Sequence, residues 1–341
     1  MNRIYLIGAI VTVLLVATVP LIIQDSYTLG FVVLAGVFSL VTVGMDMLVG
    51  YAGQISLGQG GFFAIGAYVS AILTSRYGIP PLPAMIAAVL ITALVAFVLG
   101  VPMLKALTHF HLAMATLIFA MLIYSILLIG GDFTGGFTGI QGIPPFSVGP
   151  IAIIGDVANY YLIWGIVFLG VLFAFNVANS QSGRILRAIE GDELGAQSLG
   201  VDVAQLKVKI FVLSAVYAAI AGSLIAHYTA SVTPSQYDIV TSLDFLTMAF
   251  LGGKGTVIGG VVGASFLKLL PQFTEFLKDY RLLSNGVILT IVLLFAPQGV
   301  AGVVRDLVRM LQRRSGAKVT PSEEARTAAN TAASGTAGGE L

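Results

Sequence analysis

A glycine-rich stretch, residues 50–61, contains the side chains best placed to act on a solute. So many glycines leave backbone N–H and C=O groups uncovered, which lipid does not tolerate unless protein or a water-filled path surrounds them. The stretch can line a pathway, where backbone dipoles and the amides of Gln54 and Gln59 meet a zwitterionic or polar solute. Close helix packing through small residues explains it equally well. The candidate pathway residues are Asp46, Gly50, Tyr51, Gly53, Gln54, Ser56, Gly58 and Gln59.

A second glycine cluster, residues 252–263, again separates two short apolar runs. Its candidate residues, which we assign to a second broken helix, are Gly252, Gly253, Gly255 and Gly260. Placing Gly50 on Gly252 also places Gly53 on Gly255 and Gly58 on Gly260, which suggests an internal repeat of the kind found in transporters. The cluster is not a phosphate loop, because Gly255 rather than Ser or Thr follows Lys254. We expect no ATP site in this chain.

Three ionisable residues lie near the ends of apolar segments: Asp46, Asp244 and His227. Ionisable groups inside a membrane suggest function by default. Because these three are close to a segment end, we interpret them as solvated at the interface. A proton- or sodium-coupled transporter would need a deeper relay of acids or histidines, and the sequence shows none.

The connection formed by residues 180–209 contains the largest cluster of charges between apolar segments. Apolar and charged residues recur there roughly at helical spacing, with glycines as breaks, so we expect one or two short surface helices. Such a helix can dock in a groove of a partner protein, or it can lie on lipid headgroups. The candidate docking residues are Arg187, Glu190, Glu193, Gly195, Ala196 and Gly200.

The amino-acid composition indicates whether these stretches lie in water or in a membrane. Of 341 residues, 57% are hydrophobic and 10% are charged, with a mean hydropathy of +0.97. Soluble domains have about 25% charged residues, so this is a membrane protein. A net charge of +1 argues against a nucleic-acid binder. The absence of cysteine excludes disulfides, thiolate metal sites and thiol nucleophiles. We expect no metal site and no catalytic residue.

Ten apolar segments are candidates for crossing a bilayer, which needs about 20 residues of helix. They are residues 4–23, 29–49, 62–73, 82–104, 111–130, 160–177, 210–227, 243–252, 257–270 and 282–304. Three of them are too short to cross alone. The sequence thus predicts an all-α polytopic membrane protein with about ten (eight to ten) helices, some short or broken. Residues 1–304 form the membrane domain, and residues 305–341 form a tail that we expect to be disordered from about residue 315.

The distribution of Lys and Arg predicts the orientation, because these residues concentrate on the cytoplasmic side. With ten crossings and the N-terminus inside, most of them fall inside, including those of residues 180–209. Residues 131–158, which would lie outside, contain two aspartates and no base. We therefore expect both termini to be cytoplasmic.

The run from Gly50 to Gly58, followed by residues 62–68, resembles the signature of the permease subunits of branched-chain amino acid ABC importers, of the LivM type. Residues 187–201, residues 252–264 and the Pro-Gln-Gly at 297–299 also match. The likeness spans about residues 39–304.

This resemblance implies a transmembrane subunit in a prokaryotic cytoplasmic (inner) membrane, which translocates leucine, isoleucine and valine and is not itself an enzyme. Its implied partners are a LivH-type permease, two ABC ATPase subunits that bind the ATP and Mg²⁺, and a periplasmic or extracellular solute-binding protein. Membrane lipid surrounds it, and no nucleic acid or cofactor is implied for this chain. The connection 180–209 would be the element that couples it to the ATPase.

The sequence departs from the expected pattern at several positions. In the coupling motif E-A-A-x-x-x-G, aligned on Gly200, the first three positions are Leu194, Gly195 and Ala196. The glutamate is missing, and Glu193 is a possible substitute for it. Asparagine is usual at the position of Asp46, and histidine followed by alanine is common where this chain has Gln59 and Gly60. The departures at Asp46 and at Gln59 and Gly60 weaken any transfer of exact substrate preference.

Two other functions fit the same features. A urea or short-chain amide ABC permease would use a closely similar subunit. An ion-coupled secondary transporter would work alone, without an ATPase, although the missing relay argues against it.

Overall fold

A computed structural model describes residues 25–106, 109–149 and 151–273, with isolated residues at 18, 20, 286, 287 and 290. The expected segments 4–23 and 282–304, the 297–299 motif and the tail from residue 305 lie outside this part of the chain, apart from those five isolated residues. Each of the other eight apolar segments forms a helix, as the sequence predicts.

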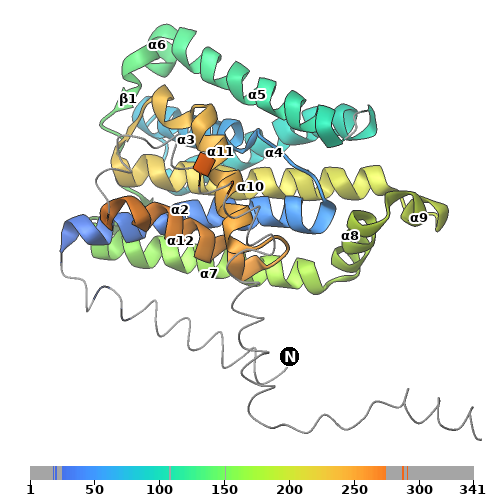
Figure 1. The fold of residues 1–341 in the computed structure, drawn as a ribbon. Coiled ribbons are helices and arrows are strands. Elements are labelled where there is room, and N and C mark those ends of the chain that lie inside the picture. Colours follow the sequence, from blue (N-terminus) through green and yellow to red (C-terminus); the bar gives the residue numbers. More distant parts are fainter. Residues whose placement is uncertain are drawn as a thin grey trace, which may run out of the picture. The chain divides into compact units, whose positions relative to one another are not determined.

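The long helices are joined by short helices and four two-residue strands (Figure 1). The helices are α2 (Ser26–Asp46), α3 (Gln59–Ser75), α4 (Pro81–Ala106), α5 (His109–Ile129), α6 (Gly131–Thr134), α7 (Asp156–Asn179), α8 (Gln181–Gly191), α9 (Glu193–Ser198), α10 (Val203–Thr229), α11 (Ile239–Gly252) and α12 (Val257–Phe273). A π-helical turn, η1 (Met47–Tyr51), extends α2, and the 3-10 turns are η2 (Gly136–Thr138) and η3 (Pro234–Tyr237). Strand β1 (Ile140–Gln141) pairs antiparallel with β4 (Ser231–Val232), and β2 (Ser147–Val148) with β3 (Ile151–Ala152).

Aspartates at helix starts explain several of the few charges in the chain. Asp25, Asp192, Asp202 and Asp238 each accept a hydrogen bond from a backbone N–H three residues later, at 3.0 to 3.1 Å. An N-cap of this kind satisfies a donor that the first helical turn leaves free, and it stabilises a helix by about 1 kcal/mol. These caps fix where α2, α9, α10 and α11 begin.

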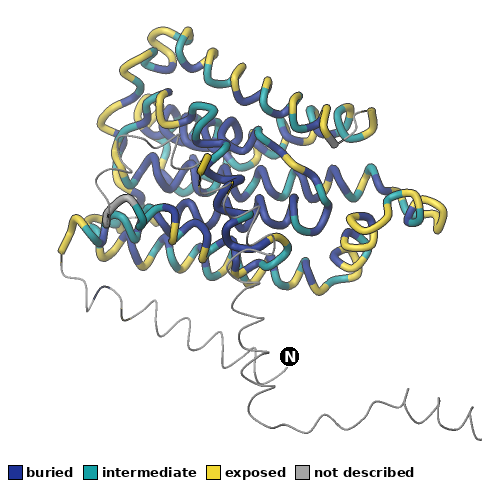
Figure 2. Tube along the Cα trace, viewed as in Figure 1, coloured by how far each residue is buried: buried dark blue, intermediate teal, exposed yellow. Residues whose placement is uncertain are grey.

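Five helices in the described part of the chain are long and apolar enough to cross a membrane: Ser26–Tyr51, Pro81–Ala106, Phe110–Ile129, Asp156–Asn179 and Val203–Thr229. The structure thus fits an all-α membrane protein. Within an apolar 18-residue window of each span, 89% of the residues are buried by protein in the first and 67% in the last, against 28%, 28% and 22% in the other three. Figure 2 shows the same contrast between the buried α2 and α10 and the more exposed α5 and α7. The exposed faces are available to lipid or to a partner.

Aromatic side chains hold together the helices on either side of the glycine clusters. The ring centroids of Phe38, Phe63 and Phe245 are 5.3 to 5.9 Å apart, which joins α2, α3 and α11. Because there is no hydrophobic driving force between helices in lipid, such van der Waals packing is one of the main contributions to their association.

The two connections that the sequence places on opposite sides of the membrane lie at opposite ends of α7. This helix has 24 residues and is therefore about 36 Å long. Helices α8 and α9 follow its C-terminal end, and the segment with α6 and the short strands precedes its N-terminal end (Figure 1). The charged connection is thus separated from the base-free one by the thickness of a bilayer.

Candidate functional site

The first glycine stretch interrupts the helix, but later than the sequence indicates. Helical structure continues through η1, and residues 53–58 form the non-helical segment before α3. The N–H of Gln54 reaches back to the carbonyl of Leu48 at 3.2 Å. Gly53 has φ +64°, a left-handed conformation that glycine adopts without a steric penalty. Gly50 and Tyr51 are therefore helical, and we call residues 53–58 the first break.

The second cluster contains the equivalent interruption. Helix α11 ends at Gly252, and residues 253–256, the second break, precede α12. Gly255 has φ +76°. It is the residue that the internal repeat places on Gly53, and both adopt the left-handed conformation. Gly260 instead lies within α12, where a Cβ would be 3.1 to 3.2 Å from the backbone of Val43 and Thr42, so this glycine serves close helix packing.

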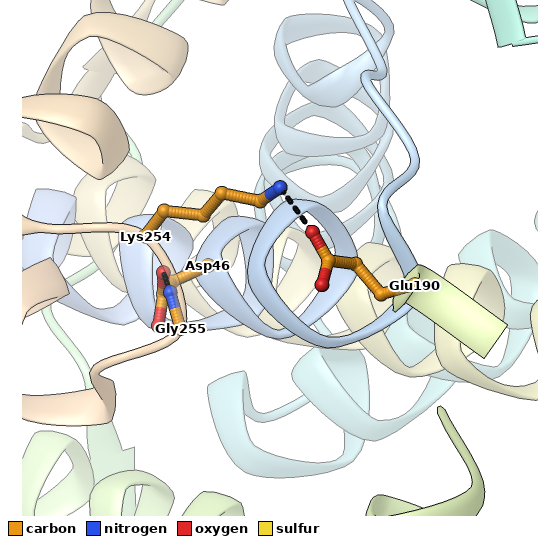
Figure 3. A network of polar contacts seen from close by, with 4 residues as sticks. All are labelled: Asp46, Glu190, Lys254 and Gly255. Atoms are coloured by element: carbon orange, nitrogen blue, oxygen red, sulfur yellow. Dashed lines mark hydrogen bonds and ion pairs between the residues drawn. The ribbon is translucent and has the colours of Figure 1, made fainter. Parts of the chain in front are cut away.

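The two broken helices contact each other directly (Figure 3). The Gly255 N–H donates to Asp46 Oδ1 at 2.8 Å. A Cβ on Gly50 would lie 2.2 Å from Gly255 N, so only glycine permits this approach. Asp46 is 0% exposed. The interpretation of Asp46 as solvated is therefore wrong, because the second break covers it.

His227 and Asp244 are also buried, at 3% and 1% exposure, so their interpretation as solvated is wrong too. His227 Nδ1 lies 2.8 Å from the Pro144 carbonyl and Nε2 lies 2.9 Å from Ser70 Oγ. Ser223 Oγ in turn donates to Ser70 Oγ. Because the Pro144 carbonyl can only accept, Nδ1 carries a proton. The imidazole fastens α10 to α3 and to the loop at Pro144.

Two glutamines at the first break have unused hydrogen-bonding capacity. Gln54 is 1% exposed, and neither its amide oxygen nor its amide nitrogen has a partner in the described part of the chain. Gln59 Nε2 donates to Ser214 Oγ at 2.7 Å, while its Oε1 has no partner there. Ser56 Oγ accepts from Gly58 N–H at 3.2 Å. Buried polar groups are normally satisfied, so these amides mark the break as a place that can receive polar groups.

Three hydroxyl residues outside the candidate set support the first break. Thr116 Oγ1 accepts from Leu57 N–H and Ser242 Oγ accepts from Gly60 N–H, both at 3.0 Å, and Ser214 binds Gln59. They come from α5, α11 and α10. Nothing in their local sequence indicates this role, because their partners lie 59, 182 and 155 positions away.

Helix α8 contacts both broken helices. The Arg187 guanidinium lies over the Tyr51 ring, 5.4 Å from its centroid. Glu190 Cγ is 3.2 Å from the place where a Cβ of Gly53 would be, and Glu190 Oε1 is 2.6 Å from Lys254 Nζ in the second break. The structure thus unites two sets of candidate residues that the sequence treats separately.

The connection 180–209 contains the two short surface helices that the sequence predicts, α8 and α9. Glu193 pairs with Lys207 of α10 at 2.7 Å. Asp192 caps the Gly195 N–H, and Ala196 is buried beside Ile189 and Val203. Gly200 has φ +80°. The large exposed apolar side chains of the connection are Leu194 at 75% and Leu199 at 86%, which the candidate set does not include.

No group of three His, Asp or Glu side chains within the described residues is placed to hold a metal ion. The arrangement offers backbone dipoles, amides and the buried carboxyl group of Asp46, which can bind and pass a solute.

Comparison with known proteins points in the same direction. Residues 27–297 match the family model described as a branched-chain amino acid transport system permease component. The high-affinity branched-chain amino acid permease LivM of Salmonella typhimurium is 27% identical over 80% of this chain and 70% of its own length. A probable LivM of Methanocaldococcus jannaschii is 24% identical over 77% and 90%. The ribose import permease RbsC of Haemophilus influenzae is 23% identical over 84% and 90%. No solved structure gives a significant match.

Proposed function

This chain belongs to the family of permease components of branched-chain amino acid transport systems, and we propose that it is a membrane-spanning subunit of an ABC importer for leucine, isoleucine and valine. The observation that carries the proposal is the contact of α8 with both broken helices. Helix α8, which lies at one end of the long helices, is therefore in direct contact with the candidate route of the solute.

The first break suits a branched-chain amino acid. Such an amino acid has a zwitterionic head, and a side-chain amide can donate to its carboxylate and accept from its ammonium group. Gln54 and Gln59 supply three buried amide atoms without partners among the described residues. The small residues of the break and the apolar side chains beside them suit the aliphatic side chain of the amino acid. Since these groups are buried in this conformation, access requires the break to move.

Helices α8 and α9 would receive the motion from the ATPase. Leu194 and Leu199 give a partner apolar contacts, and ATP and Mg²⁺ would be bound by the two ATPase subunits. The exposed faces of α4, α5 and α7 would adjoin lipid and a LivH-type permease. A solute-binding protein would deliver the amino acid at the opposite end.

The orientation follows from the distribution of Lys and Arg. We propose about ten crossings in a prokaryotic cytoplasmic membrane, with residues 1–304 forming the membrane domain, residues 180–209 the cytoplasmic connection, and both termini inside.

Reconstitution in proteoliposomes tests the proposal. The chain is assembled with its native permease, ATPase and binding-protein partners, and uptake of labelled leucine is measured with and without ATP. We expect uptake only with ATP and with all partners. Uptake by this chain alone under an ion gradient would instead identify a secondary transporter. Competition by urea or short amides, but not by valine, would reassign the substrate.

A further inference from the structure

The carboxyl group of Asp46 has an acceptor that this arrangement does not use. Oδ1 accepts the Gly255 N–H, but Oδ2 has no hydrogen-bond partner in the described part of the chain, and the residue is fully buried. A buried carboxyl oxygen is costly unless it gains a donor or a cation. The site is thus suited to receive one.

Lys254 is the cation beside this carboxyl group. The peptide bond joins it to Gly255, whose N lies 2.8 Å from Asp46 Oδ1. Its side chain nevertheless extends away, to Glu190 of α8 (Figure 3). A lysine has a flexible four-carbon stem. The ammonium group can therefore change partner while the backbone of the second break stays in place.

The pairing with Glu190 can break easily. Both side chains are about one-third exposed, at 36% for Lys254 and 34% for Glu190, and solvent weakens an ion pair of this kind. A displacement of α8 would remove Glu190 from reach. Oδ2 of Asp46, whose other carboxyl oxygen binds the N–H of the residue after Lys254, would then be the alternative acceptor.

We propose that Lys254 is a two-position switch between the helix α8 and the first broken helix. With α8 seated on the breaks, the ammonium group pairs with Glu190. When α8 moves away, it pairs with Asp46 Oδ2 and keeps the two broken helices joined. This inference rests on the proposed function, in which partner ATPases move α8.

Two nearly isosteric variants test the switch because they act in opposite directions. Asp46→Asn retains an oxygen for the Gly255 N–H but removes the negative charge that would pair with Lys254 when α8 has moved away. Glu190→Gln removes the negative charge that pairs with Lys254 when α8 contacts the breaks. Because the chain has no cysteine, spin labels can be attached through Ala188→Cys on α8 and Ile258→Cys on α12, two exposed positions. The distance distribution between them is measured in the complete importer, with and without ATP.

We expect Glu190→Gln to raise the ratio of long to short distances about two- to fivefold, and Asp46→Asn to lower it by a similar factor, as suits a partly exposed ion pair. Lys105→Met, at an exposed lysine near the end of α4, is the control and should leave the ratio unchanged. Shifts in the same direction, no shift in either variant, or an equal shift in the control would overturn the switch.

A third variant covers the case in which Asp46→Asn does not assemble. Both effects act through Lys254, so Glu190→Gln should have no effect in a Lys254→Met background. A persisting shift there would overturn the proposal. The same preparations are assayed for ATP-dependent leucine uptake. If the wild-type importer does not take up leucine, the proposed function fails. If it does and the distances do not separate, only the switch fails.

Discussion

The N–H of Gly255 donates a hydrogen bond to the carboxyl group of Asp46, which lies 209 positions earlier in the chain. This bond, with the close approach of Gly50 to Gly255, makes the two broken helices a single unit. Helix α8 contacts this unit through Arg187 and Glu190. The features that the sequence suggests as separate pathway and docking elements therefore form one cluster.

Gly50→Ala tests the contact between the broken helices. Its Cβ would overlap the backbone of Gly255 at 2.2 to 2.5 Å, and overpacking of this kind costs about 1–3 kcal/mol. We expect a lower melting temperature in detergent and a loss of ATP-driven uptake. Gly165→Ala on α7 is the matched control, because no described residue lies within 4 Å of the place where its Cβ would be. Equal behaviour of the two variants would show that the contact is not needed.

Substitutions of Gly200 can distinguish an effect of backbone conformation from an effect of side-chain size. No atom of the described residues lies within 4 Å of a Cβ placed on it, but its φ is +80°. Asparagine tolerates the left-handed conformation, whereas another residue pays about 1–2 kcal/mol for it. We expect Gly200→Asn to retain ATP-driven uptake and Gly200→Val to lose it, with normal membrane insertion in both. Full uptake by the valine variant would mean that the turn after α9 plays no part in coupling.

Glu193→Gln tests whether this glutamate holds the connection to α10. Its partner Lys207 has a side chain only 8% exposed, so the variant leaves a buried ammonium group without its carboxylate. The expected cost is about 1.5–3 kcal/mol, the range for hydrogen bonds to charged groups. Thermal unfolding in detergent measures it. Adding Lys207→Met should recover part of the loss; an additive loss would contradict the pairing.

The orientation can be tested with single cysteines in this cysteine-free chain. Leu199→Cys after α9 and Phe137→Cys in η2 are 86% and 82% exposed as the native residues, at the two ends of α7. A membrane-impermeant thiol reagent added to intact cells should label position 137 and not position 199. The reverse pattern would place α8 and α9 outside and remove the route to the ATPase.

The helices were predictable because apolar runs of bilayer length have few alternatives in lipid. The two surface helices were predictable from helical spacing and glycine breaks. The start of the first break was placed too early, since the π turn of η1 keeps Gly50 and Tyr51 helical. Glycine content alone does not distinguish an interrupted helix from a tightly packed one.

The burial of Asp46 and His227 was not predictable because it depends on distant partners. Position near a segment end suggested water, but Gly255 covers Asp46 and the loop at Pro144 covers His227. The contact of α8 with the breaks was hidden for the same reason, since Lys254 lies 64 positions from Glu190. Local sequence patterns predict the helices, whereas only the folded chain shows which helices contact each other.

The long separation between Asp46 and Gly255 also constrains biogenesis. A ribosome adding about 5–20 residues per second needs about 10–40 s to make the intervening chain. During that time the nascent α2 waits without its capping amide from the second break, and a carboxyl group there disfavours insertion into lipid. Early helices would therefore stay near the translocon or a chaperone until the later half of the protein arrives.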